Sequence, residues 1–367
     1  MHYRIHRGSP APAYLQLYEQ IKADIVRGVC PRGSRLPSKR TLAEEAGTSV
    51  VTAAHAYDLL CEEGYAESRQ RSGFFVVFHP ADGFAAAAGE SPAPHARGAG
   101  HASPTAFPFS VLAKTMRRVM SSRGEAILDK APNAGCEELR DALCRYLARS
   151  RGIEAERAQI VIGSGAEYLY GLIVGLLGRE RLFALESPSY EKIEQVYRAL
   201  GAACEFLPLG ADGIESAALR SAGASVLHIS PYRSFPTGIT ASASKRYEYL
   251  RWASRPDHFL VEDDFESEFT ILDKPEETLF ALSRDDNVVY LNTFTRTISP
   301  SLRVGYMVLP RRLVPLFAER LGHFSCTVPT FEQLVLAELI DGGGFERHIN
   351  RVRRAKRKAL RQKAPRA

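Results

Sequence analysis

The sequence predicts an α/β protein, in which a domain with a mainly parallel sheet follows a small winged helix-turn-helix domain. Three observations predict this architecture. The chain has 367 residues, a length at which one hydrophobic core usually divides into two. Residues 79–107 are rich in Ala, Gly, Pro and Ser, carry no apolar period and are typical of a linker. After this segment, short apolar strands alternate with helical stretches, which indicates parallel strands joined by helices.

The composition excludes several classes of protein. Hydrophobic residues make up 45% of the chain and charged residues 25%, which is ordinary for a globular protein. No apolar run approaches the roughly 18 to 20 residues that span a bilayer, and the start lacks the apolar core of a signal peptide, so we expect a cytoplasmic protein without membrane contact. The six cysteines are scattered and no histidine lies at metal-ligand spacing, so we expect reduced thiols and no metal. The net charge of +6 is local, because residues 351–367 hold nine Lys or Arg and no acid.

Three helices are expected before the linker. The first ends at Gly28 and repeats apolar side chains at helical spacing: Tyr14, Leu17, Tyr18, Ile21 and Ile25. Ser38 is placed to cap a second helix, after which Gly47 turns the chain. Ser49 is placed to cap a third helix, which ends at Gly64. Helix, short glycine turn and helix together form the helix-turn-helix pattern.

A wing and a basic cluster complete this first domain, residues 1–78. Two short strands, 65–68 and 74–78, enclose a tight turn and predict a β-hairpin. Basic residues crowd the start of the second helix: Arg32, Arg35, Lys39 and Arg40. Such a cluster attracts phosphates, although in isolation it is more often a solvated charged face. The helix-turn-helix and the wing beside it favour nucleic-acid binding.

The whole stretch from Pro12 to Val77 resembles the GntR family of winged-helix repressors. The residues that carry the resemblance are 33–40 (GSRLPSKR), 42–43 (LA), 47–49 (GTS), Thr52, 56–57 (AY), 63–65 (EGY) and 72–73 (SG). The resemblance implies that double-stranded DNA is the partner and assigns DNA-facing positions to Arg35, Ser38, Arg40, Ser49 and Thr52, to which the basic cluster adds Lys39. Gly73 would let the wing approach the minor groove. Where the family usually has arginine, this chain has Val50, which can donate no hydrogen bond to a base or phosphate.

The second domain, residues 108–367, is expected to place polar residues at the ends of buried strands. The predicted strands are 160–162, 182–185, 226–229, 259–261, 288–291 and 304–309. In open α/β sheets, ligands bind at the carboxyl ends of the strands. The segment 163–166 (GSGA) follows the first strand and begins a helix, which makes it either an anion site or an ordinary glycine-rich turn between the two elements. Asp263 follows the fourth strand, where its carboxylate could hold a protonated ring nitrogen or simply bond nearby amides.

Together with further segments, these pieces resemble a fold type I aminotransferase, and the whole chain is similar to a MocR-type regulator. The further segments are 186–190 (ESPSY), 230–238 (SPYRSFPTG), 262–269 (EDDFESEF) and 292–300 (NTFTRTISP) through Arg303. The resemblance runs from Phe107 to near Lys358. It implies pyridoxal phosphate as the family's cofactor.

The resemblance assigns a role in cofactor binding to seven residues. The phosphate would be held by Ser164, Gly165, Ala166, Thr293 and Arg303. Amides and a guanidinium suit a phosphate dianion. Tyr190 would stack on the ring, and the carboxylate of Asp263 would pair with its nitrogen and keep the ring an electron sink.

The residues that differ from the family pattern are those that the family uses for its cofactor chemistry. The Schiff-base lysine of the family stands in a segment that reads Thr-Phe-Thr-Arg-Thr here, so Arg296 takes its place. A guanidinium is always protonated and cannot form that covalent link. Phe265 stands where the family has a tyrosine that bonds the phenolic oxygen of the cofactor. We also expect the small C-terminal lobe, which supplies a substrate-binding arginine, to be largely missing.

These observations favour a DNA-binding transcriptional regulator with a degenerate, non-catalytic aminotransferase-like domain. That domain would serve for dimerisation and could sense a small amine or amino-acid effector, and pyridoxal phosphate would bind at most weakly and without a covalent link. The resemblance implies a homodimer. The alternatives are an aminotransferase-like enzyme that uses pyridoxal phosphate, and a truncated, decaying regulator.

Overall fold

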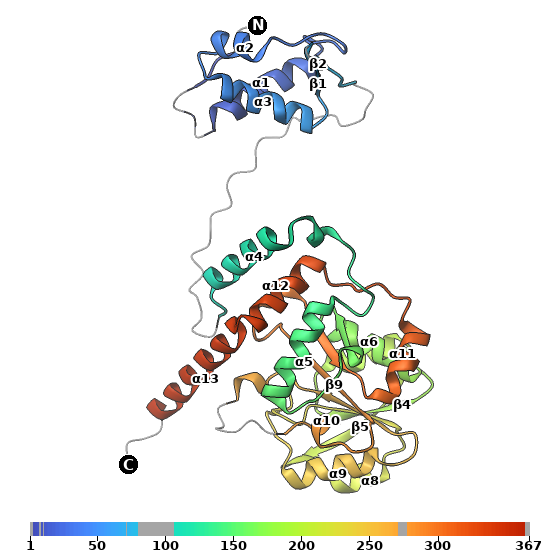
Figure 1. The fold of residues 1–367 in the computed structure, drawn as a ribbon. Coiled ribbons are helices and arrows are strands. Elements are labelled where there is room, and N and C mark those ends of the chain that lie inside the picture. Colours follow the sequence, from blue (N-terminus) through green and yellow to red (C-terminus); the bar gives the residue numbers. More distant parts are fainter. Residues whose placement is uncertain are drawn as a thin grey trace. The chain divides into compact units, whose positions relative to one another are not determined.

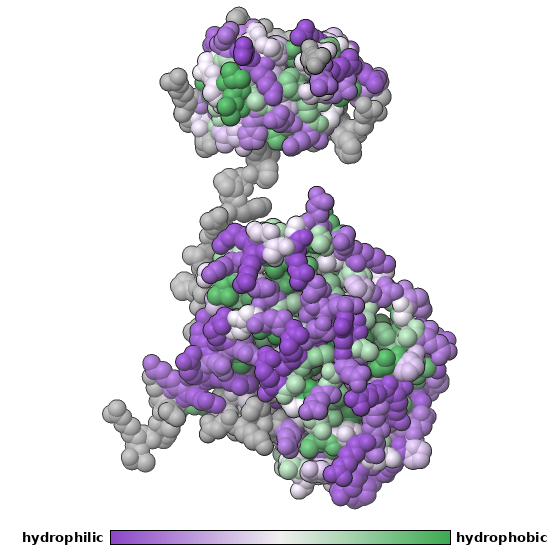
Figure 2. Space-filling view, in the orientation of Figure 1, coloured by the Kyte–Doolittle hydropathy of each residue, from purple (hydrophilic) through white to green (hydrophobic). Residues whose placement is uncertain are grey.

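The computed structural model describes residues 3–6, 9, 11–70, 72–79, 106–270 and 277–363, with side chains to residue 360. The chain divides into two units, Met1–Gly98 and Ala99–Ala367. Most of the predicted linker, residues 80–105, lies outside the described residues. The hydrophilic side chains dominate the face of each unit that Figure 2 shows, and hydrophobic areas on it are small and separate.

The first unit contains the three helices and the hairpin that the sequence predicts (Figure 1). Its elements are α1 (Ala13–Val26), α2 (Lys39–Glu45), α3 (Val50–Glu62), β1 (Ala66–Arg69) and β2 (Gly73–Val76). The two predicted caps are present, because the side-chain oxygen of Ser38 accepts the Thr41 N–H and that of Ser49 accepts the Thr52 N–H. The strands pair antiparallel, with Arg69 opposite Gly73 at the turn. Apolar residues of all three helices and of both strands form one core, which includes Leu17, Ile21, Leu42, Leu60, Ala66 and Val76.

The second unit is built on an eight-stranded sheet of order β3-β10-β9-β8-β7-β4-β5-β6. The strands are β3 (Ile160–Gly163), β4 (Leu182–Ser187), β5 (Ala203–Gly210), β6 (Gly213–Ile214), β7 (Val226–Ile229), β8 (Phe259–Asp263), β9 (Val288–Thr293) and β10 (Gly305–Val308). The neighbouring pairs β9–β8, β8–β7, β7–β4 and β4–β5 are parallel, whereas β10 runs antiparallel to β3 and to β9. The prediction of a mainly parallel sheet is therefore confirmed.

Helices cover both faces of this sheet (Figure 1). They are α4 (Phe109–Arg123), α5 (Glu137–Arg151), α6 (Ala166–Leu177), α7 (Glu191–Ala199), α8 (Ser216–Ser221), α9 (Ala243–Ala253), α10 (Leu279–Leu282), α11 (Val314–Leu321), α12 (Thr330–Asp341) and α13 (Gly344–Lys363). Successive residues of β9 show the two layers, because Tyr290 packs with α5 and α12 while Val289 and Leu291 pack with α6, α7 and α11. Each strand therefore presents alternate side chains to opposite layers.

Two strands, β5 and β6, were not predicted from the sequence. Most side chains of β5 are partly or fully exposed, and only Leu207 is buried. The strand includes Glu205 and Pro208, so it shows no apolar run. β5 is held by parallel pairing with β4 and by the short antiparallel β6 at the sheet edge. Tertiary pairing, rather than local sequence, makes this segment a strand.

Candidate functional site

In the first unit, Tyr57 of α3 joins the three elements that carry the predicted DNA contacts. Its hydroxyl donates to the Pro37 carbonyl at 2.6 Å, just before α2. Its ring stacks on Phe74 of β2, with the ring centroids 4.4 Å apart. The start of α2, the helix α3 and the wing are therefore held in one fixed arrangement.

The predicted basic contacts differ in how freely they face solvent. Arg35 and Arg40 are exposed, and neither forms an ion pair within the described part of the chain. The Arg35 guanidinium lies against the wing, since a Cβ added at Gly73 would come within 3.3 Å of its Nε, and Gly73 has a φ of +104°. Lys39 is partly engaged, because its Nζ lies 3.9 Å from an Asp58 oxygen and 5.2 Å from the centroid of the Phe74 ring.

The predicted hydroxyl contacts are also the helix caps. Besides its bond to the Thr52 N–H, the Ser49 hydroxyl lies 2.8 Å from the Thr52 hydroxyl. Ser38 makes the same pair of bonds to Thr41. At the start of α3, Val50 is 46% exposed and Val51 is 78% exposed. This end of α3 therefore presents two exposed apolar side chains beside the capping hydroxyls.

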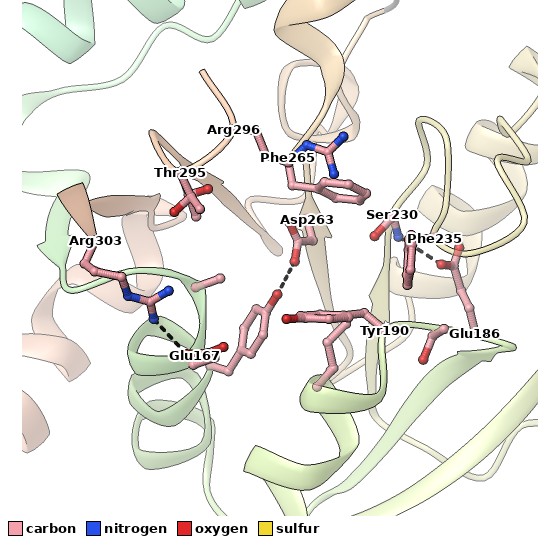
Figure 3. Close-up of a pocket in the computed structure, with 15 residues that line it drawn as sticks. Glu167, Glu186, Tyr190, Ser230, Phe235, Asp263, Phe265, Thr295, Arg296 and Arg303 are labelled. Atoms are coloured by element: carbon pink, nitrogen blue, oxygen red, sulfur yellow. Dashed lines mark hydrogen bonds and ion pairs between the residues drawn. The ribbon is translucent and has the colours of Figure 1, made fainter. Parts of the chain in front are cut away.

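In the second unit, a cavity of about 270 Å³ lies at the carboxyl ends of the strands (Figure 3). This volume is near the lower end of the range for small-molecule sites, roughly 300 to 1,000 Å³. The four strands β4, β7, β8 and β9 each bring a lining residue there, within one position of the end of the strand: Glu186, Ser230, Asp263 and Thr293. The first turn of α6 adds Ala166 and Glu167. The cavity thus lies where the sheet topology predicts a ligand site.

The carboxylate of Asp263 forms one side of this cavity. The side chain is buried, and its Oδ2 accepts a hydrogen bond of 2.5 Å from the Tyr170 hydroxyl (Figure 3). Burial raises the pKa of Tyr170, so this hydroxyl keeps its proton and donates. The Nε2 of His228 lies 3.6 Å from the same oxygen, and its Nδ1 lies 2.7 Å from the Tyr197 hydroxyl. Asp263 Oδ1 and His228 Nε2 are buried without a hydrogen-bond partner within the described part of the chain.

An unsatisfied carboxylate oxygen in a buried place is costly, so this position favours a ligand that donates a hydrogen bond. A protonated ring nitrogen is such a donor. Aromatic side chains wall the cavity: Tyr190 meets Phe235 edge to face, with centroids 6.1 Å apart, and Phe265 lines the cavity beside them. Planar apolar walls with a carboxylate between them suit a flat nitrogen-containing ring.

Glu186 adds a second buried carboxyl group. Its Oε2 accepts the Ser230 N–H at 3.2 Å and the Ser234 hydroxyl at 2.6 Å. Burial raises the pKa of Glu186 to about 7 despite these bonds. This side chain therefore changes its charge close to neutral pH.

The predicted phosphate end is occupied by charged side chains of the chain itself. Arg303 donates from Nη2 to an oxygen of Glu167 at 2.7 Å (Figure 3). The Nζ of Lys192 donates to the other oxygen of Glu167, also at 2.7 Å. A Cβ added at Gly165 would come within 3.2 Å of the Arg303 guanidinium, so this glycine permits the close approach. Glu167 was not predicted as a site residue.

Of the seven residues predicted to hold a cofactor, five line the cavity: Ala166, Tyr190, Asp263, Thr293 and Arg303. Gly165 lies against Arg303, and Ser164 does not line the cavity. Arg296 also lines it, but its Nη2 lies 2.9 Å from Glu266, which a second arginine, Arg233, approaches at 3.4 Å. The Arg296 guanidinium lies over the Phe265 ring, 5.7 Å from its centroid (Figure 3). Within the described residues, no lysine lines the cavity.

Sequence reasoning missed several side chains of this site, among them Tyr170, His228, Glu167 and Glu186. Tyr170 and His228 lie inside apolar runs, but a histidine in a strand buried on both faces must find polar partners, which is a signal for His228. Tyr170 is also four positions after Ala166 and therefore on the same face of α6. Glu167 carries no such signal, because an acid in the first turn of a helix is common.

Two kinds of feature are absent from the described residues. No helix there is both long enough and apolar enough to cross a membrane. Those residues also form no group of three or more His, Cys, Asp or Glu side chains that could hold a metal ion.

Comparison with known families gives two matches. Residues 13–76 match the bacterial regulatory proteins of the gntR family, and residues 103–364 match aminotransferase class I and II. The HTH-type transcriptional regulator YdeL of Bacillus subtilis is 31% identical over 96% of this chain and 79% of its own length. The probable rhizopine catabolism regulatory protein MocR of Rhizobium meliloti is 29% identical over 95% of this chain and 76% of its own. The pyridoxine biosynthesis regulator PdxR of Corynebacterium glutamicum is 28% identical over 94% and 76%.

Solved structures match the second unit. The kynurenine aminotransferase of Pyrococcus horikoshii is 26% identical with a TM-score of 0.62, and the match covers 68% of this chain and 64% of that one. An archaeal alanine:glyoxylate aminotransferase, 22% identical with a TM-score of 0.60, shares the fold over 66% of this chain and 62% of its own. The matches therefore span less than two thirds of these two enzymes.

Proposed function

Since the chain belongs to the GntR/MocR-type transcriptional regulators, with a gntR-family domain and an aminotransferase class I and II domain, we propose that its aminotransferase-like domain binds a small effector without catalysis. One observation carries the non-catalytic part of the proposal. Within the described residues, no lysine lines the cavity, and Arg296, which the resemblance puts in the place of the family's covalent lysine, does line it.

The environment of Arg296 supports this interpretation. A guanidinium stays protonated at any physiological pH, and its nitrogens are delocalised, so it neither attacks a carbonyl nor shuttles a proton. Glu266 bonds Arg296 and also faces Arg233, which gives the guanidinium a counter-ion. Arg296 is therefore suited to hold a fixed charge at the cavity wall.

The residues present fit the ring of pyridoxal phosphate better than its other groups. The Asp263 oxygen that lacks a partner among the described residues matches a protonated pyridine nitrogen, and Tyr190 matches the ring face. When bound, this cofactor supplies an electron-withdrawing ring. Arg303, Gly165 and Thr293 are placed for the phosphate, but Arg303 is already paired with Glu167. We therefore propose that binding is weak and without a covalent link.

For the first unit, we propose that Arg35, Arg40 and the exposed start of α3 contact double-stranded DNA. The support is that Arg35 and Arg40, which form no ion pair within the described residues, and Gly73 of the wing lie on or beside elements that Tyr57 holds together. A homodimer would present two such surfaces to paired half-sites in successive major grooves. Effector binding in the second unit would then change how the two surfaces engage the DNA.

Selection from a random pool of double-stranded DNA by the full chain tests this proposal. We expect an enriched motif with two half-sites, which binds the double variant Arg35→Ala/Arg40→Ala much more weakly. The same preparation, mixed with pyridoxal phosphate and a panel of amino acids and 2-oxo acids, should produce no transamination. Failure to enrich any motif would refute the DNA-binding part, and steady turnover would refute the non-catalytic part.

A further inference from the structure

The anion-binding end of the cavity already contains an anion. Glu167 lies in the first turn of α6, where unpaired backbone N–H groups and the helix dipole favour negative charge. Arg303 bonds one of its carboxylate oxygens and Lys192 the other, each at 2.7 Å. The carboxylate of Glu167 thus neutralises two cations beside the start of its own helix. Two cations and a helix N-terminus would together also suit a phosphate.

We propose that Glu167 acts as an internal substitute for a phosphate and makes the cavity selective for ligands that lack one. This inference rests on the proposed effector-binding role of the cavity. A phosphate that approached Arg303 would either displace the Glu167 carboxylate or lie beside it, and like charges at contact distance repel each other. The hydrogen bond from Lys192 lowers the pKa of Glu167, so the carboxylate stays charged at neutral pH.

The other end of the cavity identifies the class of ligand. Asp263 is 3% exposed and one of its oxygens has no hydrogen-bond partner among the described residues, and Glu186 is a second buried carboxyl group on the lining. Tyr190, Phe235 and Phe265 provide aromatic surface. Carboxylates among aromatic rings recognise flat cations by charge and by ring contact. The expected ligand is therefore an unphosphorylated aromatic heterocycle or amine with a protonated nitrogen.

A matched pair of probes tests this selectivity. Pyridoxamine and pyridoxamine 5′-phosphate differ only in the phosphate, and neither has an aldehyde that could react with surface lysines. Calorimetric titration would measure both against the wild-type chain, Glu167→Gln and a control, Glu154→Gln, which makes the same change at an exposed position. Thermal unfolding would confirm that each variant is folded.

We expect the wild-type chain and the control to bind pyridoxamine at least as tightly as its phosphate. Glu167→Gln should raise the affinity for the phosphate by about tenfold or more, equivalent to about 1.4 kcal/mol, and change that for pyridoxamine by less than about threefold. A tenfold preference of the wild-type chain for the phosphate would overturn the proposal, even without the variant. So would an equal effect of Glu167→Gln on both probes, or no effect on either.

The outcomes separate this inference from the proposed function. If all variants bind neither probe, the cavity does not bind this class of ligand, and both the selectivity and the effector role assigned to it are refuted. If the probes bind with a preference for the phosphate, only the selectivity is refuted. DNA selection by the same chain reports on the first unit in either case.

Discussion

The replacement of Asp263 by asparagine tests ligand binding separately from stability. The side chain is 3% exposed, Tyr170 donates to Oδ2 at 2.5 Å, and Oδ1 has no partner in the described part of the chain. Asparagine has nearly the same shape and can still accept the Tyr170 hydrogen bond. It removes the negative charge that a cationic ring would meet.

The expected magnitudes follow from these contacts. A buried hydrogen bond to a charged group contributes about 1.5 to 3 kcal/mol, so Asp263→Asn should weaken pyridoxamine binding by roughly 10- to 150-fold. The free energy of unfolding should change by less than about 2 kcal/mol, because burial of the Asp263 charge is itself unfavourable and its removal offsets part of the lost interaction.

Calorimetric titration with pyridoxamine and thermal unfolding measure the two quantities on the same preparation. Asp129→Asn is a suitable control, because Asp129 is exposed and does not line the cavity. An affinity for pyridoxamine within about twofold of wild type in Asp263→Asn would refute the assignment of Asp263 to the ring nitrogen. A large loss of stability would instead show that Asp263 mainly holds Tyr170 and His228 in place.

Three further predictions concern DNA binding and pH. Val50→Arg adds a hydrogen-bond donor and a positive charge at the exposed start of α3, so the affinity for the selected DNA should rise about 3- to 10-fold at low salt. Unchanged binding would show that this position does not reach the duplex. Arg35→Ala or Arg40→Ala should weaken binding and make the slope of log K against log salt shallower by about 0.9 if each contacts one phosphate, and an unchanged slope would contradict that contact. For pH, burial raises the pKa of Glu186 from its usual 4.5 to about 7, so the folded state binds more protons than the unfolded state between these values. The stability that this group contributes is therefore complete below about pH 4.5 and is lost as the pH rises towards 7. In thermal or denaturant unfolding, Glu186→Gln should reduce this pH-dependent fall in the free energy of unfolding by at most about 3 kcal/mol. An unchanged pH profile of stability in the variant would contradict the assignment.

Local sequence signals account for most of the first unit. Ser38 and Ser49 precede runs of helical period, and a cap needs only residues three positions away, so both caps could be predicted. The six predicted strands are buried apolar segments, which their composition reveals. β5 could not be predicted in this way, because its pairing with β4 rather than its own composition makes it a strand.

The candidate site was predictable only in part. Asp263 and the 163–166 turn stand out because they follow buried strands, and the surrounding segment suggests Arg296 as the residue in the place of the family's lysine. The partners of these residues lie far away in the sequence: Tyr170 is 93 positions from Asp263, and Arg303 is 136 positions from Glu167. Which charge neutralises which is decided by the fold, so the pairing of Glu167 with Arg303 and Lys192 at the predicted phosphate end could not be predicted from the sequence.

The central claim is that this regulator keeps a cofactor-shaped cavity but has no covalent anchor in it, and borohydride reduction tests this claim most directly. Wild-type chain and Arg296→Lys would each be incubated with pyridoxal phosphate, reduced, digested and examined by mass spectrometry. We expect no single modified lysine in the wild-type chain, and stoichiometric modification at position 296 in the variant. One stoichiometrically modified lysine in the wild-type chain would show that another side chain supplies the covalent anchor, and the claim would be wrong.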